Sequence, residues 1–168
     1  MKQIQLTAFD SNNQLARLSL VERSTEANGL HMDITIVMAG FEAKVSTFFF
    51  GYNLANFSAE LELLEVGERQ TSKLLNFDES LILSLSQTKE NPPLRYAFLS
   101  YQVPNPHPPK LCEVPVDPSI STFGLDGGTR VSVAFLRVHD RAGDIAKVLD
   151  ELISESGTGT ENPYGGDE

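Results

Sequence analysis

The sequence has no tryptophan, and it has one cysteine and three histidines among its 168 residues. Because Cys112 is alone, an internal disulfide and a cysteine-cluster metal site are excluded. His107 lies nearby in the chain, but the two side chains supply at most two of the four ligands that structural zinc usually takes. The GxSxG, HExxH and GKS or GKT motifs are also absent. We therefore expect no metal, no cofactor and no catalysis, although a carboxylate pair would leave no linear motif.

Long hydrophobic runs and basic clusters are missing as well. The apolar stretches fall far short of the roughly 20 residues that a membrane span needs, and the start MKQIQLTAFD lacks the apolar core of a secretion signal. The chain has 23 acidic and 13 basic residues, for a formal net charge of -10. Neutralising phosphates requires clustered Lys and Arg, so we expect no nucleic-acid partner. The sequence favours a cytoplasmic protein that binds no membrane and has a basic protein as its partner.

The sequence does contain many short segments in which apolar and polar residues alternate. The clearest is residues 30–38, where Leu30, Met32 and Ile34 share one face and His31 and Asp33 share the other. This period of two is typical of strands with one wet face. Gly at Ala39-Gly40 suits a tight turn, so the next strand is expected to return antiparallel. The predicted strands span residues 4–8, 16–20, 30–38, 41–50, 72–77, 81–86, 94–101, 120–125 and 130–138.

Two segments have the three-and-four spacing of an amphipathic helix. In the first, Leu54, Phe57, Leu61 and Leu64 share a face, Asn53 is the expected cap, and the helix is expected to end near residue 67. The second helix is expected to begin near residue 140 and to end before residue 157. Helix capping accounts for His139 and Asp140 at its start. The whole pattern predicts an α+β fold, in which largely antiparallel twisted sheets of about 8 or 9 strands carry two packed helices.

The chain is expected to form one domain over residues 1–154. Six of its nine prolines lie in residues 104–118, which predicts a stiff exposed loop instead of a central strand or helix. Residues 155–168 have almost no apolar content, so a disordered acidic C-terminal tail is expected there. Glycines from Gly124 onward predict the turn of a hairpin, since they lead into a strand and not into a helix.

Several side chains are candidate contacts for a partner. Phe48, Phe49 and Phe50 are consecutive, so alternation places aromatic rings on both faces of the sheet. Either both faces are covered there or one carries an exposed aromatic patch. The wet face of the first helix carries several glutamates, for which plain solvation is the simpler interpretation. The candidate interface residues are Asp33, Glu42, Phe48, Glu60, Glu62 and Glu65.

One ordered set of segments resembles a known family. A strand hairpin is followed by LANFSAELELLEVG, then by KLLNFDESLILSL, and finally by FLRVHDRAGDIAKVLDELI. This order is similar to that of small bacterial immunity proteins of the WapI-like type, over residues 34–153. The resemblance implies an antiparallel sheet with two helices, no catalysis and a toxin domain as partner. It transfers no site residues, and the proline-rich loop departs from the pattern.

Three hypotheses follow. The first is a non-catalytic, cytoplasmic protein-binding module, an immunity protein that neutralises a basic polymorphic toxin and gains speed of capture from its acidic charge. The second is a small-molecule binder or an unrecognised enzyme, with a pocket between sheet and helices lined by Phe48 and Tyr101. The third is a homo-oligomer that associates through the strand carrying residues 48–50.

Overall fold

The computed structural model describes residues 3–10, 12–104, 120–125 and 128–162, and within residues 103–129 it describes only the backbone. In these ranges the chain forms nine strands, arranged as a four-stranded and a five-stranded sheet, and two helices. Every pairing of neighbouring strands is antiparallel. The predicted α+β class is therefore confirmed.

The first sheet is a meander of β1 (Gln3–Phe9), β2 (Leu15–Glu26), β3 (Gly29–Met38) and β4 (Phe41–Phe50). Its alternating apolar residues are buried on one face, as the sequence predicts. The two-residue turn between β3 and β4 pairs Met38 with Phe41, and Gly40 has the positive φ of 73° that glycine tolerates best. β2 is longer than predicted, because it continues to Glu26 through a register shift after Glu22.

The second sheet has the order β5-β6-β7-β9-β8. Its strands are β5 (Thr71–Leu75), β6 (Leu81–Gln87), β7 (Arg95–Pro104), β8 (Ile120–Leu125) and β9 (Gly128–Phe135). Leu125 pairs with Gly128, which confirms the predicted hairpin between β8 and β9. β9 ends earlier than predicted, and the segment after it is irregular. Of the predicted proline-rich loop, Pro104 is the end of β7 and the rest lies outside the described residues.

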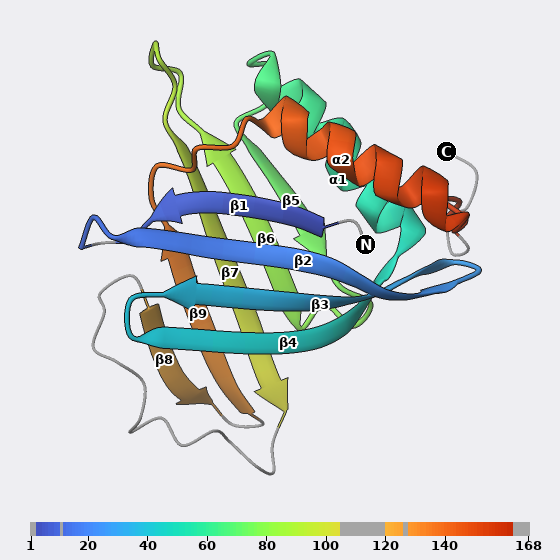
Figure 1. The fold of residues 1–168 in the computed structure, drawn as a ribbon, viewed down its shortest axis with the longest axis horizontal. Coiled ribbons are helices and arrows are strands. Elements are labelled where there is room, and N and C mark those ends of the chain that lie inside the picture. Colours follow the sequence, from blue (N-terminus) through green and yellow to red (C-terminus); the bar gives the residue numbers. More distant parts are fainter. Residues whose placement is uncertain (1–2, 11, 105–119, 126–127, 163–168) are drawn as a thin grey trace.

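The two helices are α1 (Gly51–Glu65) and α2 (Ala142–Ser156). In Figure 1 the strands of the first sheet cross over those of the second, and both helices lie together beyond β1. α1 packs against α2 and β5, while α2 also contacts β1. The helices thus close the side on which the edge strands of the two sheets would otherwise expose the core.

The buried apolar side chains form one cluster to which both sheets and both helices contribute. Phe49, Leu54, Phe135 and Leu149 are fully buried in it. A void of about 10 Å³ between the sheets and the helices is lined by aliphatic side chains and Phe57. A void of this size is about one water-sized probe. Among the described residues, this part of the interior is therefore closely filled by side chains.

The predicted caps of both helices are wrong. α1 begins at Gly51 and has no side-chain cap, while Asn53 donates from Nδ2 to the carbonyl of Leu75 at 3.4 Å. α2 begins after Arg141, and Asp140 accepts a hydrogen bond at Oδ2 from the backbone N–H of Thr7 at 2.6 Å. Asn53 thus bonds to the end of β5, and Asp140 bonds to β1. Each side chain therefore links a helix region to a strand instead of capping the helix.

The start of the predicted tail is also ordered. α2 extends to Ser156 and ends at Gly157, which has the left-handed φ of 72° common at helix ends. Thr158 is buried and donates to the carbonyl of Glu26 at 3.0 Å, and the N–H of Gly159 donates to Ala27 at 2.7 Å. The prediction of disorder from residue 155 is therefore wrong for this first part, because the hydroxyl of Thr158 and the N–H of Gly159 find acceptors at the end of β2 and in the turn that follows it. Residues 163–168 lie outside the described residues.

Candidate functional site

Four aromatic side chains gather where β4 passes into α1. We call Phe48, Phe50, Tyr52 and Phe77 the aromatic patch. The ring centroids of Phe48 and Phe50 are 5.4 Å apart at an interplanar angle of 84°, and the rings of Phe50 and Tyr52 stack at 5.4 Å. The ring of Phe77 meets that of Phe48 at 6.4 Å. Phe77 is 52% exposed, so a large apolar ring remains open to a partner.

The register of β4 and a single backbone contact build this patch. Phe48 pairs with His31 on the outer face of the first sheet, and their rings are 4.9 Å apart. Phe49 points to the inner face and is fully buried. The N–H of Phe77 donates to the carbonyl of Phe48 at 2.9 Å, which brings the segment after β5 beside the end of β4. Of the two alternatives for the three consecutive phenylalanines, the structure therefore shows a partly exposed outer patch above a buried ring.

Three carboxylates lie near the aromatic patch. Glu26 contacts His31 at 2.7 Å from Oε1 to Nε2. Asp78 and Glu79 directly follow Phe77 and are exposed. The hydroxyl of Ser80 donates to Asp78 at 2.6 Å and, as the main cause, holds the pKa of that carboxyl below its usual value. The patch is thus an apolar surface with an acidic rim.

Asp33 lies next to the patch on the same outer face, in a polar network. It accepts a hydrogen bond from the hydroxyl of Ser46 at 2.5 Å, and Lys44 and Arg23 approach its carboxylate at 3.3 and 3.9 Å. These contacts lower the pKa of Asp33, with the Ser46 hydrogen bond as the largest cause. Glu42 is exposed at the opposite end of β4, where it pairs with Val37. His31, which shares this outer face with Asp33, contacts Glu26 instead.

The three helix glutamates do not form one free acidic face. Glu60 contacts Arg69 at 3.2 Å and also accepts from the backbone N–H of Lys73. Glu65 contacts Arg141 at 2.6 Å, which links the end of α1 to the start of α2. Glu62 alone among them is exposed. Plain solvation therefore describes the exposed Glu62 but not Glu60 or Glu65, because cations from neighbouring segments bind these two.

Two of the six predicted interface residues, Phe48 and Asp33, lie at or beside the aromatic patch. Glu42 and the helix residues lie elsewhere. Phe77 was missed because it approaches Phe48 only where the chain returns after β5. Tyr52 was missed because its stacking on Phe50 depends on the course of the chain from β4 into α1. The only signal in the sequence was that Phe77 is apolar and directly precedes the turn residues Asp78 and Glu79.

The hollows near these residues are open and polar. The groove between α1 and β5 has a volume of about 430 Å³ and is lined by Asn53, Asn56, Glu60, Arg69 and Lys73 among others. The void of about 10 Å³ between the sheets and the helices is not lined by Phe48 or Tyr101, the two residues predicted to line a ligand pocket there. In the described ranges, no three His, Cys, Asp or Glu side chains lie close enough together to hold a metal ion. His107 and Cys112 lie outside those ranges.

No protein-family model, no curated protein and no solved structure matches the chain. The resemblance to WapI-like immunity proteins therefore stays a prediction. Neither α1 nor α2 is long and apolar enough to cross a membrane, and no other helix occurs in the part of the chain that the structure describes.

Proposed function

We propose that the protein is a non-catalytic, cytoplasmic protein-binding module, and specifically an immunity protein that neutralises a basic toxin. The observation that carries the proposal is the aromatic patch with its acidic rim. Aromatic side chains dominate the binding energy of many interfaces, because they bury a large area with few rotatable bonds. Phe77, as the most exposed of the four rings, is the anchor in this proposal.

The charge of the chain supports a basic partner. A net charge of -10 attracts a cationic protein to this chain and raises the association rate at low salt. Glu26, Asp78 and Glu79 then contribute local carboxylates around the rings. Such rim charges act mainly on the association rate, while buried rings act mainly on the dissociation rate. The proposal thus assigns different kinetic roles to the two parts of the surface.

Affinity capture with matched variants tests the proposal. Phe77→Ala removes the exposed ring, and Phe98→Ala removes a ring that is 44% exposed on β7 of the other sheet. We expect the wild type and Phe98→Ala to capture a basic protein from the source cells or their secreted fraction. Phe77→Ala should lose at least about tenfold in affinity, the effect expected for an interface hot spot. If Phe77→Ala binds as tightly as the wild type, the aromatic patch is not the interface.

The contribution of α1 is tested with Glu62 alone. Reversing Glu60 or Glu65 would also break contacts within the chain, so a change in binding could reflect a change in structure. Glu62→Lys has no such effect in the described structure. If α1 faces the partner, this variant should slow association at low salt and have less effect at high salt. An unchanged association rate would remove α1 from the interface.

Self-association is the second candidate, and one observation favours it. β4 is an edge strand of the first sheet, and it carries two of the four rings of the patch. Edge strands expose backbone groups that can pair with another chain. Sedimentation velocity at micromolar concentration distinguishes the candidates, since a protein that remains monomeric contradicts self-association through residues 48–50.

A further inference from the structure

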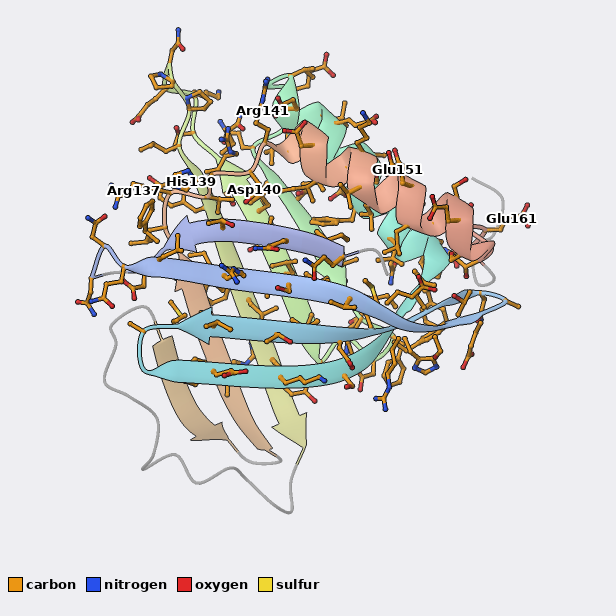
Figure 2. All side chains as sticks on the ribbon, viewed as in Figure 1. Arg137, His139, Asp140, Arg141, Glu151 and Glu161 are labelled. Carbon is orange, nitrogen blue, oxygen red and sulfur yellow. The ribbon has the colours of Figure 1, made fainter. Side chains whose placement is uncertain are left out.

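A hollow of about 310 Å³ lies at the opposite end of the first sheet from the aromatic patch. Figure 2 labels Arg137 and His139 in this region, next to the end of β1. Both side chains carry or can carry positive charge, and they lie on the irregular segment between β9 and α2. The hollow is lined by Phe9, Pro93, Leu94, Arg95, Arg137, Val138 and His139. We call it the basic hollow.

Backbone hydrogen bonds fix this irregular segment on both sides of Arg137. Leu136 exchanges hydrogen bonds with Phe9, at 2.7 and 2.8 Å. The N–H of Val138 donates to the carbonyl of Arg95 at 2.8 Å, and that of His139 donates to Thr7 at 2.8 Å. The segment therefore bridges the two sheets, from β1 in the first to β7 in the second.

Arg137 takes a strained conformation within this bridge. Its φ is 53°, in the left-handed region that residues other than Gly, Asn and Asp seldom adopt. Backbone strain of this kind persists only where the surroundings impose it, and it is enriched at binding sites. Asn or Gly would fit the same backbone with less strain. The arginine is thus placed where backbone stability alone would favour another residue.

Contacts with aromatic rings orient the cationic groups. The guanidinium carbon of Arg137 lies 4.7 Å from the centroid of the Phe9 ring, and the ring of His139 is 5.1 Å from the same ring. A guanidinium that stacks on a ring keeps the N–H groups at its edge available to an anion. Arg95 donates from Nη2 to the carbonyl of His139 at 3.3 Å, which holds it in the same wall of the hollow.

The cations of the basic hollow have no carboxylate partner among the described residues. Arg95 and Arg137 form no ion pair there, and the Nε of Arg95 has no hydrogen-bond acceptor. The nearest carboxylate in sequence, Asp140, is engaged by the N–H of Thr7 at 2.6 Å. In a chain with 23 acidic and 13 basic residues, two unpaired arginines in one hollow form a local positive site.

We propose that the basic hollow binds the phosphate group of a phosphomonoester. A single arginine fork already satisfies the two oxygens of a carboxylate, whereas two arginines and a histidine match the three terminal oxygens and the double charge of a phosphomonoester. Phe9, Pro93 and Leu94 give the hollow an apolar wall for the group that carries the phosphate. The hollow lies at the lower limit of ligand-pocket volumes, which fits a small phosphate ester. This inference is independent of the proposed protein-binding role.

Titration of the full, isotope-labelled chain by NMR tests the inference, with inorganic phosphate, phenyl phosphate and a phosphoserine peptide as probes at constant ionic strength. We expect saturable shifts of the backbone amides of Arg95, Arg137 and His139, with phenyl phosphate binding tighter than inorganic phosphate. Tighter binding of the phosphoserine peptide would assign the phosphate to a modified protein, and tighter binding of phenyl phosphate would assign it to a small molecule. The absence of saturable shifts with all three probes would overturn the inference.

Two arginine variants separate this site from a general charge effect. Arg137→Asn should weaken phosphate binding by about tenfold or more, because it removes a charge-assisted donor. Its melting temperature should not fall by more than a few degrees, since Asn tolerates the left-handed backbone. Arg141→Asn removes the same charge from the same segment, but Arg141 is paired with Glu65. This control should keep the wild-type affinity, and an equal loss in both variants would overturn the inference.

Discussion

The aromatic patch and the basic hollow lie at opposite ends of the first sheet, and they are built in opposite ways. The patch arises mainly from regular strand register, because β4 alternates its rings between the two faces. The hollow arises from irregular backbone, because the segment around Arg137 is fixed by hydrogen bonds to two different sheets. Both surfaces contain a ring beside charged groups, but the charge is negative around the patch and positive in the hollow.

This difference shows how one acidic chain can present two binding chemistries. The charge of -10 describes the whole chain and favours a basic partner. The local field at Arg95 and Arg137 depends on which carboxylates their neighbours engage, and Asp140 is held by β1. The hollow can thus be positive in an acidic chain because no ion pair joins Arg95 or Arg137 to a carboxylate among the described residues.

The largest effect should come from Phe49, the buried member of the three consecutive phenylalanines. Phe49 is fully buried, so Phe49→Ala should lower the free energy of unfolding by about 3–5 kcal/mol through lost burial and a residual cavity. Phe77→Ala, at a side chain that is 52% exposed, should cost no more than about 1 kcal/mol. Chemical denaturation measures both values. Equal losses would mean that the patch is part of the core and not a separate surface.

The next effect concerns the hydrogen bond that ties the segment after β9 to β1. Asp140→Ala leaves the partly buried N–H of Thr7 without its acceptor and should cost about 1–3 kcal/mol of unfolding free energy. Asp144→Ala is the matched control, because Asp144 is an exposed carboxylate in the first turn of α2. The control should cost only about 0.3–1 kcal/mol, from its interaction with the helix dipole. If both variants are equally stable, the basic hollow does not depend on this bond.

Much of the fold could be predicted from the sequence, because periodicity reports which side of an element is buried. The alternation of Leu30, Met32 and Ile34 located β3, and the spacing of Leu54, Phe57 and Leu61 located α1. The caps were wrong because Asn53 and Asp140 bind strands that lie far away in the chain. Local preference could not show that these tertiary partners would be available.

The candidate sites were less predictable for the same reason. The sequence showed that the rings of Phe48 to Phe50 occupy both faces of the sheet, but the position of Phe77 beside Phe48 depends on a backbone contact between β4 and the segment after β5. Helical periodicity likewise placed Glu60 and Glu65 on the polar side of α1 without revealing their cationic partners. The basic hollow joins three distant segments, and its strained arginine has no sequence signature at all.

The smallest effect expected is a shift in the titration of Asp33, the carboxylate beside the aromatic patch. Its pKa is lowered from 3.8, and the hydroxyl of Ser46 is the main cause. A lowered pKa means that folding favours the ionised carboxylate. Asp33 therefore contributes stability at pH values above its unfolded pKa, and this contribution is lost as the pH falls through the lower folded pKa.

Ser46→Ala removes the main cause, so the pKa of Asp33 should rise toward 3.8 while Lys44 and Arg23 still hold it slightly below that value. Titration of the carboxyl carbon by NMR measures this shift. Asp78 is an internal control, because its pKa is lowered mainly by Ser80 and should not respond to the variant. If Asp33 titrates unchanged in Ser46→Ala but shifts in Lys44→Met, the cation and not the hydroxyl controls the charge beside the patch. The pKa of Asp33 would then depend on ionic strength, because salt screens the interaction between exposed charges.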